Sequence, residues 1–222
     1  MPQRRMVLAN NEIYHVFNRS IGGQHIFAQN QKFNLSKALE IINYYRFPQK
    51  IRLSRFRNLS SQLKKQYLDS VGSVTPLVEI YVFAFMSNHF HFLLKQMRDK
   101  GIATFVANFQ NSFAKVFNLK NDRNGALFQN AFKAKRIETD EQFIHVSRYI
   151  HLNPVTAYII EFDKLASFEW TSFSAYANER VSFVNSDLLL KMFGTKEKYI
   201  KFVADQVDYQ RNLAHIKDLM ID

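Results

Sequence analysis

Two histidines stand out in this sequence because their spacing would let them act together. His89 and His91 lie two residues apart in the segment HFHFLLK, which has the composition of a β-strand. Alternate side chains of a strand point to one face of its sheet, so both imidazoles would project together, while Phe90 and Phe92 would point the other way. Two imidazoles placed in this way can share one divalent metal ion. The same pattern also fits two ordinary histidines on a half-exposed sheet face.

A tyrosine and an asparagine form a second candidate pair. Tyr149 and Asn153 lie four residues apart in RYIHLNP and would share one face of a helix. Tyrosine can act as a covalent nucleophile, and the amide oxygen of asparagine suits a hard metal such as Mg²⁺. The alternative is a core tyrosine followed by an asparagine that caps the helix before Pro154. His145, four residues before Tyr149 on the same stripe, is a rival third ligand or general base.

A third feature is the basic segment 46–68, which contains no acidic residue. Lysine and arginine side chains could neutralise phosphates here, and the interleaved Phe47, Phe56 and Tyr67 could stack on unpaired bases. The alternative is the solvated basic face of a packed helical hairpin. Together with basic residues of the later segment 126–136, the predicted nucleic-acid-binding residues are Arg46, Lys50, Arg52, Arg55, Arg57, Lys64, Lys65, Lys133, Lys135 and Arg136.

The composition favours a folded protein with a polyanionic partner. The 222 residues are 47% hydrophobic and include 22 phenylalanines, enough for a substantial core. The formal net charge of +11 favours nucleic acid as the partner, although it says nothing about the fold. No basic amphipathic helix with a clean apolar face supports a membrane surface as the rival partner.

Several features point to a cytoplasmic protein. The absence of cysteine excludes disulfides and thiolate chemistry and favours an intracellular setting. The opening MPQRRMVLAN has no long apolar run behind its charges, unlike a secretory signal. No stretch approaches the roughly 18 uninterrupted apolar residues of a membrane span. We therefore expect a soluble cytoplasmic protein with no membrane partner.

The elements that must position these residues follow from hydrophobic periodicity. The patterns predict strands over 12–18, 78–86, 89–95 and 126–136 and helices over 31–45 and 101–118. A further helix is expected to begin at Thr139, which forms a capping-box pattern with Gln142. It should end at about Asn153, because Pro154 disfavours helical geometry in the residue before it.

This order of elements predicts an α+β protein of the ferredoxin-like, split βαβ class. Such a protein has one antiparallel sheet with helices on one face. Residues 46–75 would form a basic insertion within a domain spanning 1–160. Residues 161–222 would form a C-terminal helical extension, in which Ser186 or Asn185 caps DLLLKMF.

Taken together, these segments resemble a known family. The sequences IYHVFNRSIGGQHIF at 13–27, FMSNHFHFLL at 85–94, GALFQNAFKAKRI at 125–137, RYIHLNPVTAYII at 148–160 and EWTSFSAY at 169–176 are similar to those of HUH single-tyrosine transposases. The resemblance is to the REP-associated and IS200-like members in particular. It covers most of residues 12–176, and the combination of MSNHFH with RYIHLNPV is much more specific than either half.

The resemblance implies a role for each motif residue. His89 and His91 would be metal ligands, Tyr149 the nucleophile, and Asn153 the polar residue that completes a site for Mg²⁺ or Mn²⁺. The implied activity is that of a transposase-type endonuclease. It cleaves and rejoins single-stranded, hairpin-bearing DNA through a 5′-phosphotyrosine intermediate, leaving a free 3′-OH. The relatives include dimers that exchange the tyrosine helix and monomers that use their own, so a homodimer and a monomer both fit.

Two other functions fit some of the same residues. A catalytically inactive DNA-binding regulator would need the basic residues but not the intact motif residues. A metal hydrolase acting on nucleic acid would use His89, His91 and His145 with water as the nucleophile, and its product would be free of protein. RNA is a further conceivable target, but the sequence contains no RNP-type aromatic motif that would favour it.

Overall fold

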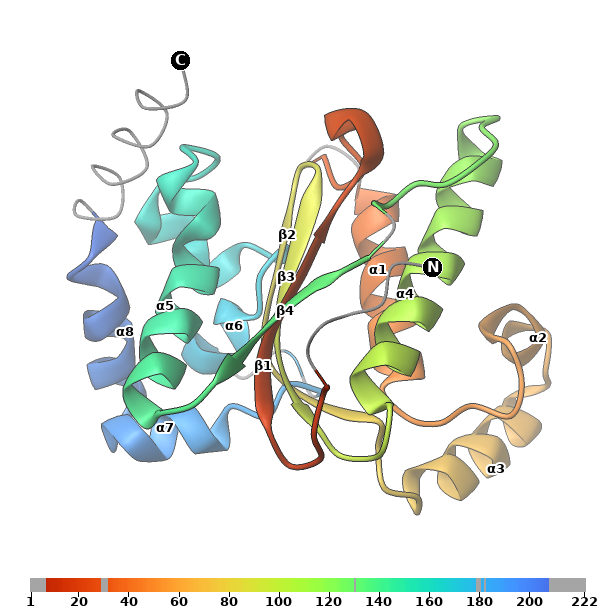
Figure 1. The fold of residues 1–222 in the computed structure, drawn as a ribbon, viewed down its shortest axis with the longest axis horizontal. Helices are drawn as coiled ribbons and strands as arrows, with labels where there is room; N and C mark the ends of the chain where they lie inside the picture. Colours follow the sequence, from red (N-terminus) through yellow and green to blue (C-terminus); the bar gives the residue numbers. More distant parts are fainter. Residues whose placement is uncertain (1–6, 29–31, 130, 179–180, 182, 208–222) are drawn as a thin grey trace.

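A four-stranded antiparallel sheet runs through the middle of the molecule, between two layers of helices (Figure 1). The computed structural model describes residues 7–28, 32–129, 131–178, 181 and 183–207. The strands are β1 (Ile13–Arg19), β2 (Val78–Met86), β3 (His89–Gln96) and β4 (Lys133–Ile137). The α-helices are α1 (Lys32–Tyr45), α2 (Leu53–Arg57), α3 (Ser61–Gly72), α4 (Gly101–Lys120), α5 (Asp140–Thr156), α6 (Phe173–Ala177), α7 (Asp187–Phe193) and α8 (Lys196–Ala204). Two 3₁₀ helices are η1 (Ile21–Gly23) and η2 (Phe162–Ser167).

The sheet has the ferredoxin-like order that the sequence predicts. Its strands lie in the order β2-β3-β1-β4, and each neighbouring pair is antiparallel. Helices α1 and α4 cover one face, where Phe90 and Phe92 of β3 pack against Phe109 of α4, with ring centroids 5.1 and 5.5 Å away. The predicted α+β class is therefore confirmed. Within the described part of the chain, no helix is long and apolar enough to cross a bilayer.

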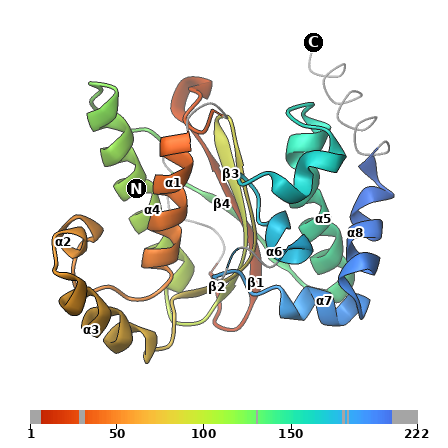
Figure 2. The same ribbon diagram turned by 180° about the vertical axis from the view of Figure 1, so that it is seen from behind.

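The opposite face of the sheet is covered by α5, α6, α7 and α8 (Figure 2). We expected helices on one face and treated residues 161–222 as an extension. Leu165, Phe173 and Tyr199 of that region instead share a core with Val82 and Leu93 of the sheet. The reason is that β2 is apolar along almost its whole length, so both of its faces require burial. Residues 208–222 of the predicted extension lie outside the described residues.

Helix α5, which carries the predicted nucleophile, begins where the sequence indicates but ends later. The Thr139 hydroxyl accepts the backbone N–H of Gln142 at 3.1 Å, which confirms the predicted cap. The predicted end at Asn153 is wrong, because Pro154 lies inside the helix. Pro154 is buried, and the N–H of Ala157 still donates to the carbonyl of Asn153 at 3.0 Å. Tertiary packing thus outweighs the local preference of the residue before a proline.

The strand predicted over 126–136 is shorter than expected and begins at Lys133. Phe128 still forms an isolated antiparallel bridge with Ser20, and the N–H of Gln129 donates to the carbonyl of Arg19 at 2.9 Å, but regular pairing with β1 begins only at Lys133. Residue 130, within the predicted strand, and residue 31, at the predicted start of the first helix, lie outside the described residues.

At the start of α7, the Asn185 side chain accepts the N–H of Asp187, so Asn185 rather than Ser186 provides the side-chain cap.

Residues 46–75 contain α2 and α3, which form a small helical hairpin next to α1 (Figures 1 and 2). The rings of Tyr44, Phe56 and Tyr67 pack together, with Phe56 centred 5.1 Å from Tyr44 and 5.6 Å from Tyr67. Arg57 forms a bidentate ion pair with Glu40 of α1, at 2.6 and 2.7 Å. The packing of these rings and the Arg57–Glu40 ion pair therefore hold the hairpin to α1.

A buried polar network holds α5 against the sheet and against α8. His151 Nε2 lies 2.9 Å from the Ser172 hydroxyl, which in turn accepts the backbone N–H of Phe83 on β2 at 2.9 Å. His151 Nδ1 lies 2.8 Å from the hydroxyl of Tyr199, which donates to the Ser147 hydroxyl at 3.2 Å. Since both ring nitrogens have partners, the network fixes how far α5 stands from β2.

Replacing Gly101 with alanine should destabilise the protein, because a Cβ at the start of α4 would overlap the backbone carbonyl oxygen of Leu77. Overpacking of this kind costs about 1–3 kcal/mol. Urea unfolding followed by circular dichroism should show a lower midpoint. Gly72→Ala at the end of α3 is the matched control, since open space surrounds that position and its midpoint should stay the same or rise. Equal midpoints for the two variants would contradict the packing argument.

Acid should destabilise the protein through His151. Burial lowers the pKa of His151 to about 3, whereas the unfolded chain takes up this proton near pH 6.5. The free energy of unfolding should therefore fall as the pH drops from about 6.5 toward 3, by on the order of 1.4 kcal/mol per pH unit for this group. Urea unfolding in EDTA at pH 7 and pH 5 measures the difference.

Two variants isolate this contribution. His151→Gln should lower stability at pH 7 but flatten its pH dependence by about one proton. His145→Gln, at an exposed position on the same helix, should keep the steeper dependence of the parent. A pH dependence that is the same in His151→Gln and the parent would show that His151 does not resist protonation in the folded state.

Candidate active site

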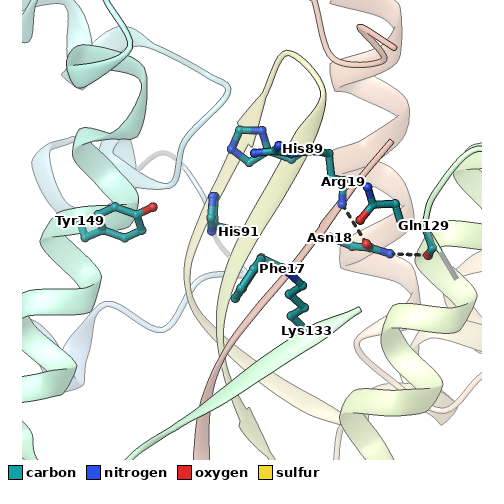
Figure 3. Close-up of a pocket in the computed structure, with 8 residues that line it drawn as sticks. All are labelled: Phe17, Asn18, Arg19, His89, His91, Gln129, Lys133 and Tyr149. Atoms are coloured by element: carbon teal, nitrogen blue, oxygen red, sulfur yellow. Dashed lines mark hydrogen bonds between the residues drawn. The ribbon is translucent and has the colours of Figure 1, made fainter. Parts of the chain in front are cut away.

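Three of the four predicted motif residues, His89, His91 and Tyr149, line one pocket on the face of the sheet that α5 covers. His89 and His91 of β3 have ring centroids 5.0 Å apart, and the ring of Tyr149 lies 5.8 Å from that of His91. Figure 3 shows Tyr149 projecting from α5 toward the two histidines. The pocket has a volume of 380 Å³ and is lined by Phe17, Asn18, Arg19, His89, His91, Gln129, Lys133 and Tyr149.

Each histidine has a hydrogen-bond partner at Nδ1. His89 Nδ1 lies 2.7 Å from the Oδ1 of Asn88, the residue before it in the turn between β2 and β3. His91 Nδ1 lies 2.9 Å from Nε2 of His15, on the neighbouring strand β1. The other ring nitrogen of His91, Nε2, is buried and has no hydrogen-bond partner among the described residues. A buried nitrogen without a partner in a pocket is what a metal ligand requires before its metal binds.

Burial lowers the pKa of the three imidazoles in this cluster. Desolvation is the largest cause in each case, and it brings the pKa of His15 and of His89 to about 4 and that of His91 well below its usual value. The charge of Lys135 contributes at His15, and that of Arg19 contributes at His89. All three rings are therefore neutral near pH 7, which is the form in which imidazole binds a metal ion.

The two neutral histidines fit a divalent cation but do not by themselves complete its coordination. Asn153 lies one helical turn after Tyr149 and is 8% exposed, but it is not among the residues that line the pocket. Its atom without a hydrogen-bond partner among the described residues is Nδ2, a donor that cannot bind a cation. In the described part of the chain, no group of three His, Cys, Asp or Glu side chains could hold a metal ion. A cation bound by His89 and His91 would therefore need an amide oxygen such as that of Asn153, water or a substrate oxygen to complete its coordination.

Tyr149 combines an accessible ring with a phenol that is hard to ionise. Its side chain is 42% exposed, the most exposed of the predicted motif residues. Burial of the phenol raises its pKa, and the neighbouring Asn153 side chain and the charge of Arg19 oppose that rise. The phenol is thus protonated near neutral pH and would need help from nearby positive charge to attack. Within this chain, the ring of Tyr149 lies 5.8 Å from that of His91.

Two cations line the pocket, and only one of them was predicted. Arg19 ends β1 directly opposite His89, and Lys133 begins β4 opposite Phe17. Among the described residues, neither Arg19 nor Lys133 has a carboxylate within ion-pair distance. Both charges therefore remain available to an anionic ligand in the pocket.

The other predicted basic residues are placed differently. Lys135 and Arg136 lie on β4 beyond the pocket, and Arg136 forms an ion pair with Glu12 at 2.8 Å. The basic residues of the insertion belong to the α2–α3 region, on the side of the sheet opposite α5 (Figure 1). This set consists of Arg46, Lys50, Arg52, Arg55, Arg57, Lys64 and Lys65. The structure therefore does not bring them together with the histidines and Tyr149.

His145, the rival third ligand, is not part of the pocket. It is exposed on α5, and its Nδ1 lies 2.7 Å from the guanidinium of Arg148. Its ring lies 5.8 Å from that of Phe202 on α8. These contacts place His145 on the side of α5 that faces the C-terminal helices.

Sequence reasoning missed His15, Arg19 and Asn88. Alternation within the predicted strand 12–18 would have placed Ile13, His15 and Phe17 on one face. That alternation does not say which residues of another strand lie beside them, because the register between strands is a tertiary property. The signal for Asn88 was its position immediately before His89.

Comparisons with known proteins bear on the family and the fold. Residues 49–153 match the family described as "Transposase IS200 like", and that segment contains His89, His91, Tyr149 and Asn153. No curated protein sequence matches the chain significantly. A solved structure of a REP-associated tyrosine transposase bound to a REP hairpin matches with a TM-score of 0.54 at 14% identity, over 84% of this chain and 90% of that one. At that identity, the similarity shows a shared fold. The sequence match over residues 49–153 confirms the resemblance to the IS200-like transposases, and the solved structure shows a shared fold.

Proposed function

We propose that this protein cleaves and rejoins single-stranded DNA through a covalent bond between Tyr149 and the 5′ phosphate of the break. The observation that carries the proposal is the convergence of a tyrosine, two neutral histidines and two cations without carboxylate partners in one pocket. Tyrosine is an established type of covalent nucleophile. The other residues match what an attack on a phosphodiester needs, namely positive charge and a fixed geometry.

The proposed substrate is DNA with a hairpin next to the cleavage site. The net charge of +11 favours a polyanion, and the structural neighbour described above was solved with a REP hairpin. Cations with no carboxylate partner at the pocket would meet the phosphates near the break, and the exposed basic residues of α2 and α3 would meet phosphates elsewhere. Because one chain holds every residue of the pocket, we propose that a monomer is competent for cleavage.

The cleavage step conserves one phosphoester bond. The Tyr149 oxygen bonds to phosphorus as the bond from phosphorus to the 3′ oxygen breaks, the phenolic proton passes to water, and the 3′ oxygen gains a proton. Attack by that 3′-OH, or by another one, on the phosphotyrosine reverses the step, so rejoining requires no nucleotide cofactor. Arg19 and Lys133 would hold the phosphate in the pocket and balance the charge that develops on its oxygens.

The proposed cation would be held by His89 and His91 through nitrogen and by Asn153 through its amide oxygen. When bound, Mg²⁺ or Mn²⁺ would withdraw charge from the scissile phosphate and stabilise the transition state. Neutrality of both imidazoles and the unpartnered His91 Nε2 support this assignment. The raised pKa of Tyr149 explains why such help is needed, since an unassisted phenol would stay protonated.

His89→Ala and His91→Ala should abolish cleavage and leave most of the DNA affinity. Affinity should come mainly from basic groups, whereas cleavage needs the proposed cation. The assay is cleavage of a hairpin-bearing single strand in Mg²⁺ or Mn²⁺, beside a binding measurement in EDTA. His145→Ala should cut like the parent, because His145 lies outside the pocket. Full activity in the His89, His91 double variant would exclude the metal site, and loss of activity in His145→Ala would favour a three-histidine hydrolase.

Tyr149→Phe should remove the covalent intermediate without disturbing the fold, because it deletes only the phenolic oxygen of a partly exposed side chain. Incubation of the parent with hairpin DNA and Mn²⁺ should yield a denaturation-resistant adduct at the 5′ side of the break. Peptide mapping should locate the DNA on residue 149. The control Tyr158→Phe, at an exposed tyrosine outside the pocket, should still form the adduct. If Tyr149→Phe cuts as well as the parent, the nucleophile is water and the single-tyrosine mechanism is wrong.

A further inference from the structure

His15 belongs neither to the His89–His91 motif nor to the Tyr149–Asn153 motif. It is nevertheless in direct contact with His91, one of the proposed ligands. Its Nε2 lies 2.9 Å from Nδ1 of His91, and the two rings stack with an interplanar angle of 24°. His15 is 9% exposed and His91 is 5% exposed. Two neutral imidazoles at this distance share one proton, so one ring must donate and the other must accept.

The surroundings of His91 decide which ring donates. If His15 donated, the proton of His91 would sit on Nε2, where it would be a buried N–H without a partner among the described residues. Buried unpaired N–H groups are rare, and they are costly. If His91 donates through Nδ1, its Nε2 carries a lone pair instead, and that lone pair can bind a cation when one enters the pocket.

His89 provides an internal comparison for this assignment. Its Nδ1 lies 2.7 Å from Oδ1 of Asn88, an atom that can only accept. The amide orientation is supported because Asn88 Nδ2 donates to the carbonyl of Gly23 at 3.4 Å. His89 therefore also carries its proton on Nδ1 and offers Nε2. Both proposed ligands would then present the same nitrogen, each fixed by a partner on the far side of the ring.

We propose that His15 is a positioning residue that accepts the Nδ1 proton of His91 and so holds the His91 ring in the tautomer and orientation that leave Nε2 free for the divalent cation. This inference rests on the metal-dependent function proposed above. A partner of this kind fixes the tautomer and the ring plane of a ligating histidine and increases its basicity. His15 is placed to accept this proton, because its Nε2 lies 2.9 Å from Nδ1 of His91 and the two rings stack.

The first experiment needs no metal and no DNA. Long-range proton–nitrogen NMR correlations of the ¹⁵N-labelled protein in EDTA report which ring nitrogen of each histidine is protonated, and His91→Gln assigns the signal. We expect the Nδ1–H tautomer for both His89 and His91 in the parent. In His15→Leu, the His91 signal should move away from that single tautomer, while the His89 signal should not change. An Nε2–H tautomer of His91 in the parent would overturn the proposal.

The second experiment measures Mn²⁺ affinity by titration followed with electron paramagnetic resonance. His15→Leu keeps a similar volume but offers no acceptor, and it should weaken Mn²⁺ binding by about 10–100-fold. His15→Gln can place its Oε1 near the position of the imidazole Nε2 and should retain affinity to within a few fold. Circular dichroism and thermal melts confirm that both variants are folded.

The outcomes separate this inference from the proposed function. If the parent binds Mn²⁺ no better than His89→Ala, the metal site itself is wrong and the role of His15 falls with it. If the parent binds Mn²⁺ but His15→Leu and His15→Gln lose affinity equally, His15 does not act as an acceptor, and only the present proposal is overturned. The same follows if His15→Leu retains full affinity.

Discussion

The candidate site depends on the register between β1 and β3. That register sets Arg19 opposite His89 and Phe17 opposite His91, and it brings His15 within hydrogen-bond distance of His91. Because side chains alternate along a strand, a slip of one residue would turn His15 toward the aromatic core. Tyr14 and Val16, which are almost fully buried on that other face, oppose such a slip. The packing of one face of the sheet therefore determines the chemistry available on the other.

The second constraint is the placement of α5 over the polar face. The helix packs against β2, and the hydrogen bonds of His151 tie it to the sheet and to α8. These contacts are made by residues on its buried side, which leaves Tyr149 partly exposed over the histidines. Among the described residues, the same geometry leaves Nε2 of His91 buried without a partner. Such an atom destabilises a fold, and a cation in the pocket would give it one.

The positive charge of the chain is distributed over regions with different environments. Arg19 and Lys133 lie at the pocket without a carboxylate partner in the described structure, whereas Arg57 and Arg136 are paired with Glu40 and Glu12. The aromatic side chains between the basic residues of α2 and α3 pack on one another and on α1. Ion pairs contribute nothing to the net charge of +11, and that number says nothing about where the unpaired positive charge lies.

Local patterns in the sequence determined the elements and the motif residues. Periodicity predicted β2 and β3, the H-x-H alternation and the cap of α5 at Thr139, since these depend only on neighbours along the chain. Tertiary structure decided the rest. Packing around Pro154 extended α5. Only the pairing of distant strands brought His15 and Arg19 to the histidines. Those contacts join residues 70 or more positions apart, and their geometry depends on a register and a helix position that no local pattern specifies.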